Sequence, residues 1–113
     1  MTEADLEVML QEGRLAAPPL EIRVLAGPIR GRDALIDVAW RGRSCRFVAQ
    51  LRRDAKPLTL KVAIEQVRGS ADSTRAVRPM IVAPYFSREK LDQLLEAGIS
   101  AIDFSGNAVI NVP

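Results

Sequence analysis

Apolar and charged residues alternate every second position over residues 20–26, which is the pattern of a half-buried β-strand. A second strand is predicted over 33–40, where the residues are almost all apolar, so we expect this strand to lie inside its sheet. A third strand is predicted over 44–51. The Arg41-Gly42-Arg43 segment between the second and third strands suits a tight hairpin turn. The pattern therefore predicts an antiparallel meander of three strands.

A spacing of three or four residues between apolar positions predicts helices elsewhere in the chain. Thr2 and Ser87 are suitable N-caps for two of these helices, and Pro57 suits the first turn of another. The predicted order is a helix over 2–13, the meander, a helix over 57–68, a strand over 80–83, a helix over 88–97, and two short strands over 99–104 and 108–112.

The length and the composition of the chain predict a single cytoplasmic domain. A chain of 113 residues has room for one domain, which we place over 1–113. It stops directly after an apolar strand, so one hypothesis is that it is the N-terminal fragment of a longer protein. The apolar runs are too short for a membrane span, and the acidic N-terminus is unlike a signal peptide. The single cysteine, Cys45, fits a reducing cytoplasm, so we expect a cytoplasmic protein without a membrane partner.

The chain contains no histidine. Catalysis by a Ser-His-Asp or Cys-His arrangement and every His-containing zinc site are thereby excluded. A chemical reaction would have to depend on carboxylates, Lys or Arg, hydroxyls, Cys45, or a hard metal ion held by oxygen atoms.

The net charge is only +2, but residues 41–53 hold five arginines and no acid. Arginine binds phosphate through two parallel hydrogen bonds, so a local run of arginines suits DNA. The candidate DNA-binding residues are Arg41, Arg43, Arg46 and Arg53. The alternative is that this run is a solvated face without a ligand.

Asp37 is the leading candidate for a chemical role, because it lies within an apolar strand. Burying a carboxylate is costly unless it is paired or bound to a metal ion. Side chains alternate along a strand, so Gln50 and Arg52 share one face of the third strand, and we expect that face to meet Asp37. Asp37 is therefore interpreted as the partner of Arg52 in an ion pair, as a solvated carboxylate, or as a metal ligand.

The order helix, meander, helix, strand over residues 2–83, with Asp37 on the second strand and Ala49-Gln50-Leu51-Arg52 on the third, resembles the restriction-endonuclease-like superfamily, the PD-(D/E)xK nucleases. The resemblance implies an α/β (α+β) domain of three layers, in which helices flank a central mixed sheet. In active members, an aspartate on the second strand and an acid-x-lysine motif on the third hold magnesium and activate water. Asp37 matches the aspartate, Gln50 falls at the second acid, and Arg52 falls at the lysine.

Both departures from the motif predict a degenerate active site. Glutamine is a weaker ligand for a hard cation than a carboxylate, and arginine cannot readily exchange a proton. Some members place the second acid on the following helix, where Glu65 is the candidate. At 100° per residue, however, Glu65 is expected to point away from the sheet. We therefore expect no cofactor, with magnesium at Asp37 only if the domain is active.

Residues 78–110 carry a second resemblance, which depends mainly on Asp103-x-Ser105-Gly106-Asn107. They are similar to bacterial regulators of the abortive-infection (type IV) antitoxin-like group, in which a degenerate nuclease-like domain accompanies a winged-helix DNA-binding domain. Asp103 and Asn107 could bind a cation, but an aspartate before a Ser-Gly-Asn turn is typical of a residue that forms the turn.

Three functions remain open at this stage. The leading hypothesis is a non-catalytic nuclease-fold domain of a bacterial DNA-associated transcriptional regulator or antitoxin-like protein, which binds DNA phosphates weakly. The second is a metal-dependent DNA endonuclease with a rearranged active site. The third is a protein-interaction or dimerisation module, either with another protein or as a homodimer.

Overall fold

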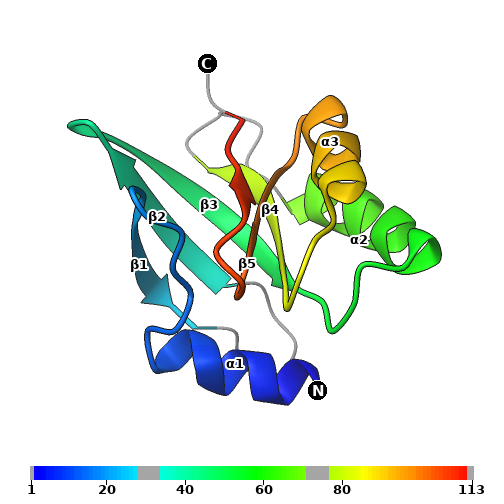
Figure 1. Ribbon diagram of the computed structural model, residues 1–113, viewed down its shortest axis with the longest axis horizontal. Coiled ribbons are helices and arrows are strands. Elements are labelled where there is room, and N and C mark those ends of the chain that lie inside the picture. Colours follow the sequence, from blue (N-terminus) through cyan, green and yellow to red (C-terminus); the bar gives the residue numbers. More distant parts are fainter. Residues whose placement is uncertain (1, 28–33, 71–76, 112–113) are drawn as a thin grey trace.

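The computed structural model describes residues 2–27, 34–70 and 77–111. Within these ranges the chain forms three helices and one six-stranded sheet (Figure 1). The elements are α1 (Glu3–Gln11), β1 (Glu21–Ala26), β2 (Ala34–Trp40), β3 (Arg43–Leu51), α2 (Pro57–Ser70), β4 (Arg78–Ala83), α3 (Arg88–Glu96), β5 (Ser100–Asp103) and β6 (Ala108–Val109).

The sheet is mixed, and its strands lie side by side in the order of the sequence. β1, β2 and β3 form the predicted antiparallel meander, which is confirmed. β4 runs parallel to β3, β5 runs parallel to β4, and β6 is antiparallel to β5. The parallel connections from β3 to β4 and from β4 to β5 pass through α2 and α3, as parallel neighbours require.

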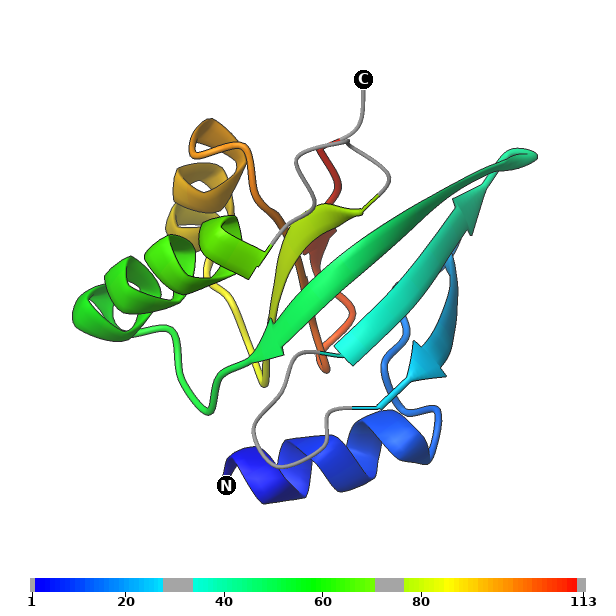
Figure 2. The same cartoon turned by 180° about the vertical axis from the view of Figure 1, so that it is seen from behind.

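The hairpin between β2 and β3 is as tight as predicted. Trp40 pairs with Arg43, so the turn itself consists of Arg41 and Gly42. These two residues have φ angles of +50° and +77°, the left-handed conformation that both central residues of a type I′ turn adopt. The turn lies at the end of a long arm that projects away from the helices (Figures 1 and 2).

The helices cover the two faces of the sheet unequally. α1 packs on one face through Leu6 and Leu10, against Ile36, Phe47 and Met80 among others. α2 and α3 pack on the opposite face, with Leu60 and Leu94 against Ile81. Figure 2 shows these layers from behind, with α1 apart from the α2 and α3 pair. The three-layer architecture is thereby confirmed.

One face of the meander keeps a polar, partly exposed surface. β2 lies between β1 and β3, as its apolar sequence predicted, but only every second residue is fully buried. The alternate residues Leu35, Asp37 and Ala39 are half-buried, because α2 and α3 cover β3 to β6 and leave β1 and β2 open on that side. This open face is where Asp37 lies.

The predicted element boundaries differ from the observed ones by a few residues. α2 continues to Ser70, β4 already begins at Arg78, and β6 is limited to Ala108–Val109. The sequence also predicts a turn over 27–32 and an irregular loop over 69–78. Residues 28–32 of that turn and 71–76 of that loop lie outside the described residues. Among the residues described, no helix is both long enough and apolar enough to cross a bilayer.

Candidate nucleic-acid interface

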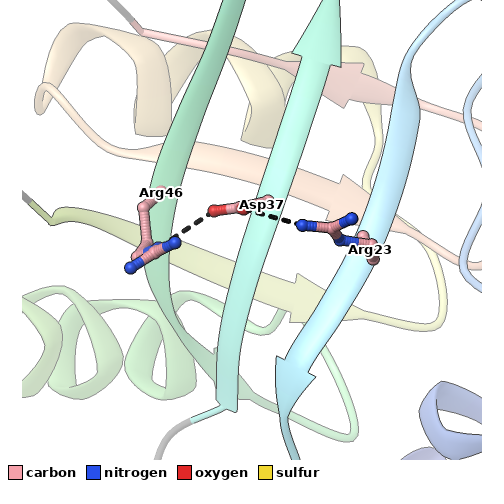
Figure 3. Close-up of polar contacts among 3 residues, drawn as sticks. All are labelled: Arg23, Asp37 and Arg46. Atoms are coloured by element: carbon pink, nitrogen blue, oxygen red, sulfur yellow. Dashed lines mark hydrogen bonds and ion pairs between the residues drawn. The ribbon is translucent and has the colours of Figure 1, made fainter.

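Asp37 lies in the middle of β2, between one arginine on each neighbouring strand (Figure 3). The register places Arg23 of β1 and Arg46 of β3 directly opposite it. The Nε of Arg46 donates a hydrogen bond to Oδ1 of Asp37 at 3.1 Å, and Nη2 of Arg23 lies 3.8 Å from Oδ2. The three residues therefore form a row across the meander, which we call the Arg23–Asp37–Arg46 row.

This row carries a net charge of +1 on an open surface. The Asp37 side chain is 19% exposed, whereas those of Arg46 and Arg23 are 49% and 78% exposed. A guanidinium has five N–H donors, so each arginine keeps several donors beyond its contact with Asp37. Exposed ion pairs of this kind contribute only about 0.2–1 kcal/mol to stability. The row can therefore present two cations to an anionic ligand without being essential to the fold.

The predicted ion pair between Asp37 and Arg52 is wrong. Asp37 faces Arg46, and Arg52 comes six residues later, about 20 Å further along an extended chain. Gln50 is four residues from Arg46, so it lies about 13 Å along β3 from the position opposite Asp37. Gln50 and Arg52 do share the face of the sheet on which Asp37 lies, as predicted. The register between β2 and β3, however, pairs Asp37 with Arg46 and not with Arg52.

Gln50 and Arg52 form a separate cluster with α2. The Arg52 guanidinium donates to the side-chain oxygens of Gln50 and Gln66, and to the carbonyl oxygen of Leu51 at 2.9 Å. Gln50 is only 7% exposed, so its amide oxygen is held by this contact away from water. These are the positions at which the resemblance places the second acid and the lysine. Arg52 thus joins the end of β3 to α2.

The Gln50–Arg52–Gln66 cluster does not fit a magnesium ion. A hard cation needs oxygen ligands, preferably carboxylates, and the Gln50 oxygen already accepts from a guanidinium. No group of three Asp, Glu, Cys or His side chains that could hold a metal ion occurs within the described part of the chain. Glu65 is exposed and lines a groove between α2 and α3 with Lys61 and Gln93, in line with the expectation that it points away from the sheet.

The arginines predicted to bind DNA do not form one strip. Arg41 and Arg43 lie at the hairpin tip, and Arg46 lies three residues after Arg43, so its side chain points to the opposite face of the sheet. Arg53 follows the far end of β3, with its Nε 3.9 Å from the carboxylate of Asp54. Sequence patterns do not indicate Arg23, because it lies on β1 outside the arginine run, and only the register brings it beside Asp37.

Asp103 is fully buried and forms the turn after β5. Its Oδ1 accepts from the backbone N–H groups of Ser105 and Asn107, and its Oδ2 accepts from the Phe86 N–H and from the Asn107 side chain, all within 2.8–2.9 Å. A carboxylate has about four lone-pair sites, and these contacts use all of them. The interpretation of Asp103 as a turn-forming residue is confirmed.

The order and direction of the helices and strands define the class of fold. A mixed sheet in which an antiparallel meander precedes a helix and a parallel strand, between one helix and a pair of helices, is a nuclease-like α/β fold. Among solved structures the chain is similar to EndoMS in its apo form, with a TM-score of 0.52 and 15% sequence identity. The match covers 100% of this chain and 48% of that chain, so this protein spans about half the length of EndoMS.

At this identity the likeness shows the fold alone. No protein-family model matches the sequence, and no curated protein matches it either.

Proposed function

We propose that the chain is a non-catalytic domain of nuclease-like fold in a bacterial DNA-associated regulator or antitoxin-like protein, and that its arginines contact DNA phosphates weakly. The observation that carries the proposal is the position of Arg52. Its guanidinium is bound by Gln50 and Gln66 where active members of the resembled superfamily have a metal-binding acid and a lysine.

The loss of catalysis follows from the chemistry of this cluster. A guanidinium is a cation that does not readily exchange a proton, so Arg52 repels a metal ion and is unsuited to proton transfer. Gln50 supplies a neutral oxygen that already has a donor. The Asp37 carboxylate, which would be the remaining ligand, is engaged with two arginines at a distance from the cluster.

The proposed DNA contacts come from two places. The Arg23–Asp37–Arg46 row presents two guanidiniums on the open face of the meander, and Arg41 and Arg43 project at the hairpin tip. Each phosphate neutralised contributes about −0.9 to the slope of log affinity against log salt concentration. Two or three contacts give a slope of roughly −2 to −3, with a dissociation constant no better than about 10⁻⁴ to 10⁻⁶ M at physiological salt.

A cleavage assay tests the non-catalytic part of the proposal. Plasmid and single-stranded DNA incubated with the protein and magnesium or manganese should remain intact. Cleavage that disappears in Asp37→Ala would contradict the proposal and favour the metal-dependent endonuclease with rearranged acids.

A salt titration of duplex DNA binding tests the phosphate contacts. The double variants Arg23→Ala/Arg46→Ala and Arg41→Ala/Arg43→Ala should each weaken binding at low salt and make the salt dependence shallower. The matched control is Arg14→Ala/Arg88→Ala, which removes two exposed arginines on α3 and after α1. If the control weakens DNA binding equally, the loss of affinity comes from the lower net charge of the protein and not from contacts at these arginines.

The second candidate function is a protein-interaction or dimerisation module. It is favoured by Leu58 and Val62, which are exposed on α2, and by Leu95, which is exposed on α3. If low-salt titration detects no DNA binding, and sedimentation shows an oligomer that Leu58→Glu dissociates, this function takes precedence over the first.

A further inference from the structure

A hollow of about 510 Å³ lies beside the hairpin tip, on the face of the sheet opposite Arg46. Its wall is apolar and includes Leu20, Val38 and Ile110. Trp40, Arg41 and Arg43 also line it, at the end nearest the turn. Its volume falls within the range of about 300–1,000 Å³ that small-molecule sites occupy.

Trp40 is the distinctive residue of this hollow. It is the only tryptophan in the chain, and 48% of its surface is exposed although the indole is large and apolar. The Arg41 guanidinium carbon lies 4.6 Å from the centre of the ring, a cation–π contact. Tryptophan is the side chain on which unpaired nucleobases stack well, and such stacking tolerates any base.

The charges around the hollow indicate that a ligand bound there is anionic. Arg41 and Arg43 contribute two positive charges, and no acid occurs among the described residues that line it. An apolar wall, an exposed indole and two guanidiniums together match a ligand with a planar aromatic ring and a neighbouring anionic group. A nucleotide in a single strand has both parts within a few ångströms.

We infer that the hairpin tip binds an unpaired nucleotide, with its base in the hollow against Trp40 and its phosphate held by Arg41 and Arg43. The inference deepens the proposed function, on which it rests for the DNA partner. Duplex DNA offers the phosphates but not the base, because extracting a base from the stack costs a few kcal/mol. The hairpin tip should therefore prefer single-stranded over duplex DNA.

The sole tryptophan provides a direct measurement. Intrinsic fluorescence is recorded while the protein is titrated at low salt with a short oligothymidine, and separately with the same strand paired to oligodeoxyadenosine. Quenching by the single strand is expected, with little or none by the duplex.

Variants then locate the contact. Trp40→Leu should weaken binding of a labelled oligothymidine by roughly 5- to 150-fold, measured by fluorescence anisotropy. The matched control is Tyr85→Leu, which removes an aromatic side chain that is 58% exposed and lies outside the hollow. It should leave the affinity unchanged. Equal melting temperatures for the two variants would show that both remain folded.

The outcomes separate this inference from the proposed function. If the duplex binds with the expected salt dependence and Trp40→Leu has no effect on either DNA, the unpaired-nucleotide site is refuted while the phosphate contacts stand. If neither DNA binds, both proposals fail. Fluorescence that changes with protein concentration and not with DNA would show that a second copy of the chain covers the hollow, which also overturns the inference.

Discussion

At the scale of single residues, two aspartates in similar sequence settings have different surroundings. Asp37 and Asp103 each lie in an apolar strand, yet Asp37 is placed between two guanidiniums and Asp103 accepts four N–H hydrogen bonds. The sequence predicts a partner for Asp37, because a buried carboxylate without one is costly, and a turn-forming role for Asp103. It predicts the local donors of Asp103 in the turn, but not the Phe86 N–H, which is seventeen residues away. Nor does it predict the partners of Asp37, which depend on strand register.

Replacing Asp103 should be strongly destabilising. Asp103→Asn preserves the volume but turns one acceptor into a donor that faces buried N–H groups. An unsatisfied buried polar group costs about 1–3 kcal/mol, so we expect a loss of roughly 3 kcal/mol in the free energy of unfolding, measured by urea denaturation. The control Asp92→Asn disrupts only the exposed contact with Arg88 and should cost less than about 0.5 kcal/mol.

Two further aspartates make stability depend on acid pH. Hydrogen bonds from the backbone and side chain of Thr2 hold the pKa of Asp5 below its ordinary value of 3.8. The Lys56 N–H, the Thr59 side chain and the nearby charges of Lys56 and Arg53 do the same to the pKa of Asp54. A carboxyl whose folded pKa is lowered stabilises the fold above its unfolded pKa, and this contribution disappears as the pH falls through the folded pKa.

We therefore expect the free energy of unfolding to decrease as the pH falls below about 3.8. NMR titration of the side-chain carboxyls should show midpoints below 3.8 for Asp5 and Asp54. The double variant Asp5→Asn/Asp54→Asn should lose less stability over this range than the parent protein. An equal loss in both proteins would assign the acid sensitivity to other groups.

At the scale of elements, sequence patterns identify each helix and strand that the described residues form, because periodicity and caps are local properties. The Thr2 side chain accepts from the Asp5 N–H at the start of α1, and Ser87 accepts from the Lys90 N–H at the start of α3. The role of Arg52 was not predictable in the same way. Its partner Gln66 is fourteen residues away, on α2, and reaches it only through the packing of α2 on the sheet.

The contact between β3 and α2 predicts that Arg52 contributes more to stability than Arg46 does. Arg52→Ala should reduce the free energy of unfolding by about 1–2 kcal/mol, because it leaves the buried Gln50 oxygen without its donor. Arg46→Ala should reduce it by less than about 1 kcal/mol, because its ion pair with Asp37 is half exposed. Chemical denaturation of the two variants side by side tests this order.

The hairpin turn can be tested through its glycine. Gly42 has a φ of +77°, and a Cβ added there would meet no atom within 4 Å, so only backbone strain opposes a side chain. Gly42→Ala should cost about 1–2 kcal/mol in the free energy of unfolding. Gly27→Ala is the control, since that residue lacks a positive φ and its added Cβ would touch only the flexible Gln11 side chain. Equal effects would show that the turn tolerates alanine.

At the scale of the whole molecule, β4 is shared by both hydrophobic cores. Met80 and Val82 point toward α1, while Ile81 and Ala83 point toward α2 and α3, and all four are fully buried. The uninterrupted apolar sequence of this strand already predicts burial on both faces. The similarity to EndoMS is one of three-dimensional arrangement, because the two sequences are only 15% identical.

This arrangement predicts the pattern of amide hydrogen exchange. Amides of β4 should exchange last, near the rate set by global unfolding, because β4 is hydrogen-bonded on both edges and covered on both faces. Amides of β1 and β6, at the sheet edges, should exchange first. Faster exchange in β4 than in β1 would contradict the assignment of β4 as the centre of the fold.

The coincidence of strand order and sequence order has a consequence for how the chain folds. Each strand pairs with the one made immediately before it, so no strand has to be inserted between two that are already joined. Contacts between neighbours in the sequence shorten the loops that must close, which accelerates folding among proteins of similar size. On a ribosome, the meander from β1 to β3 can form while α2 and the later strands are still being synthesised, and the sheet then extends in a single direction.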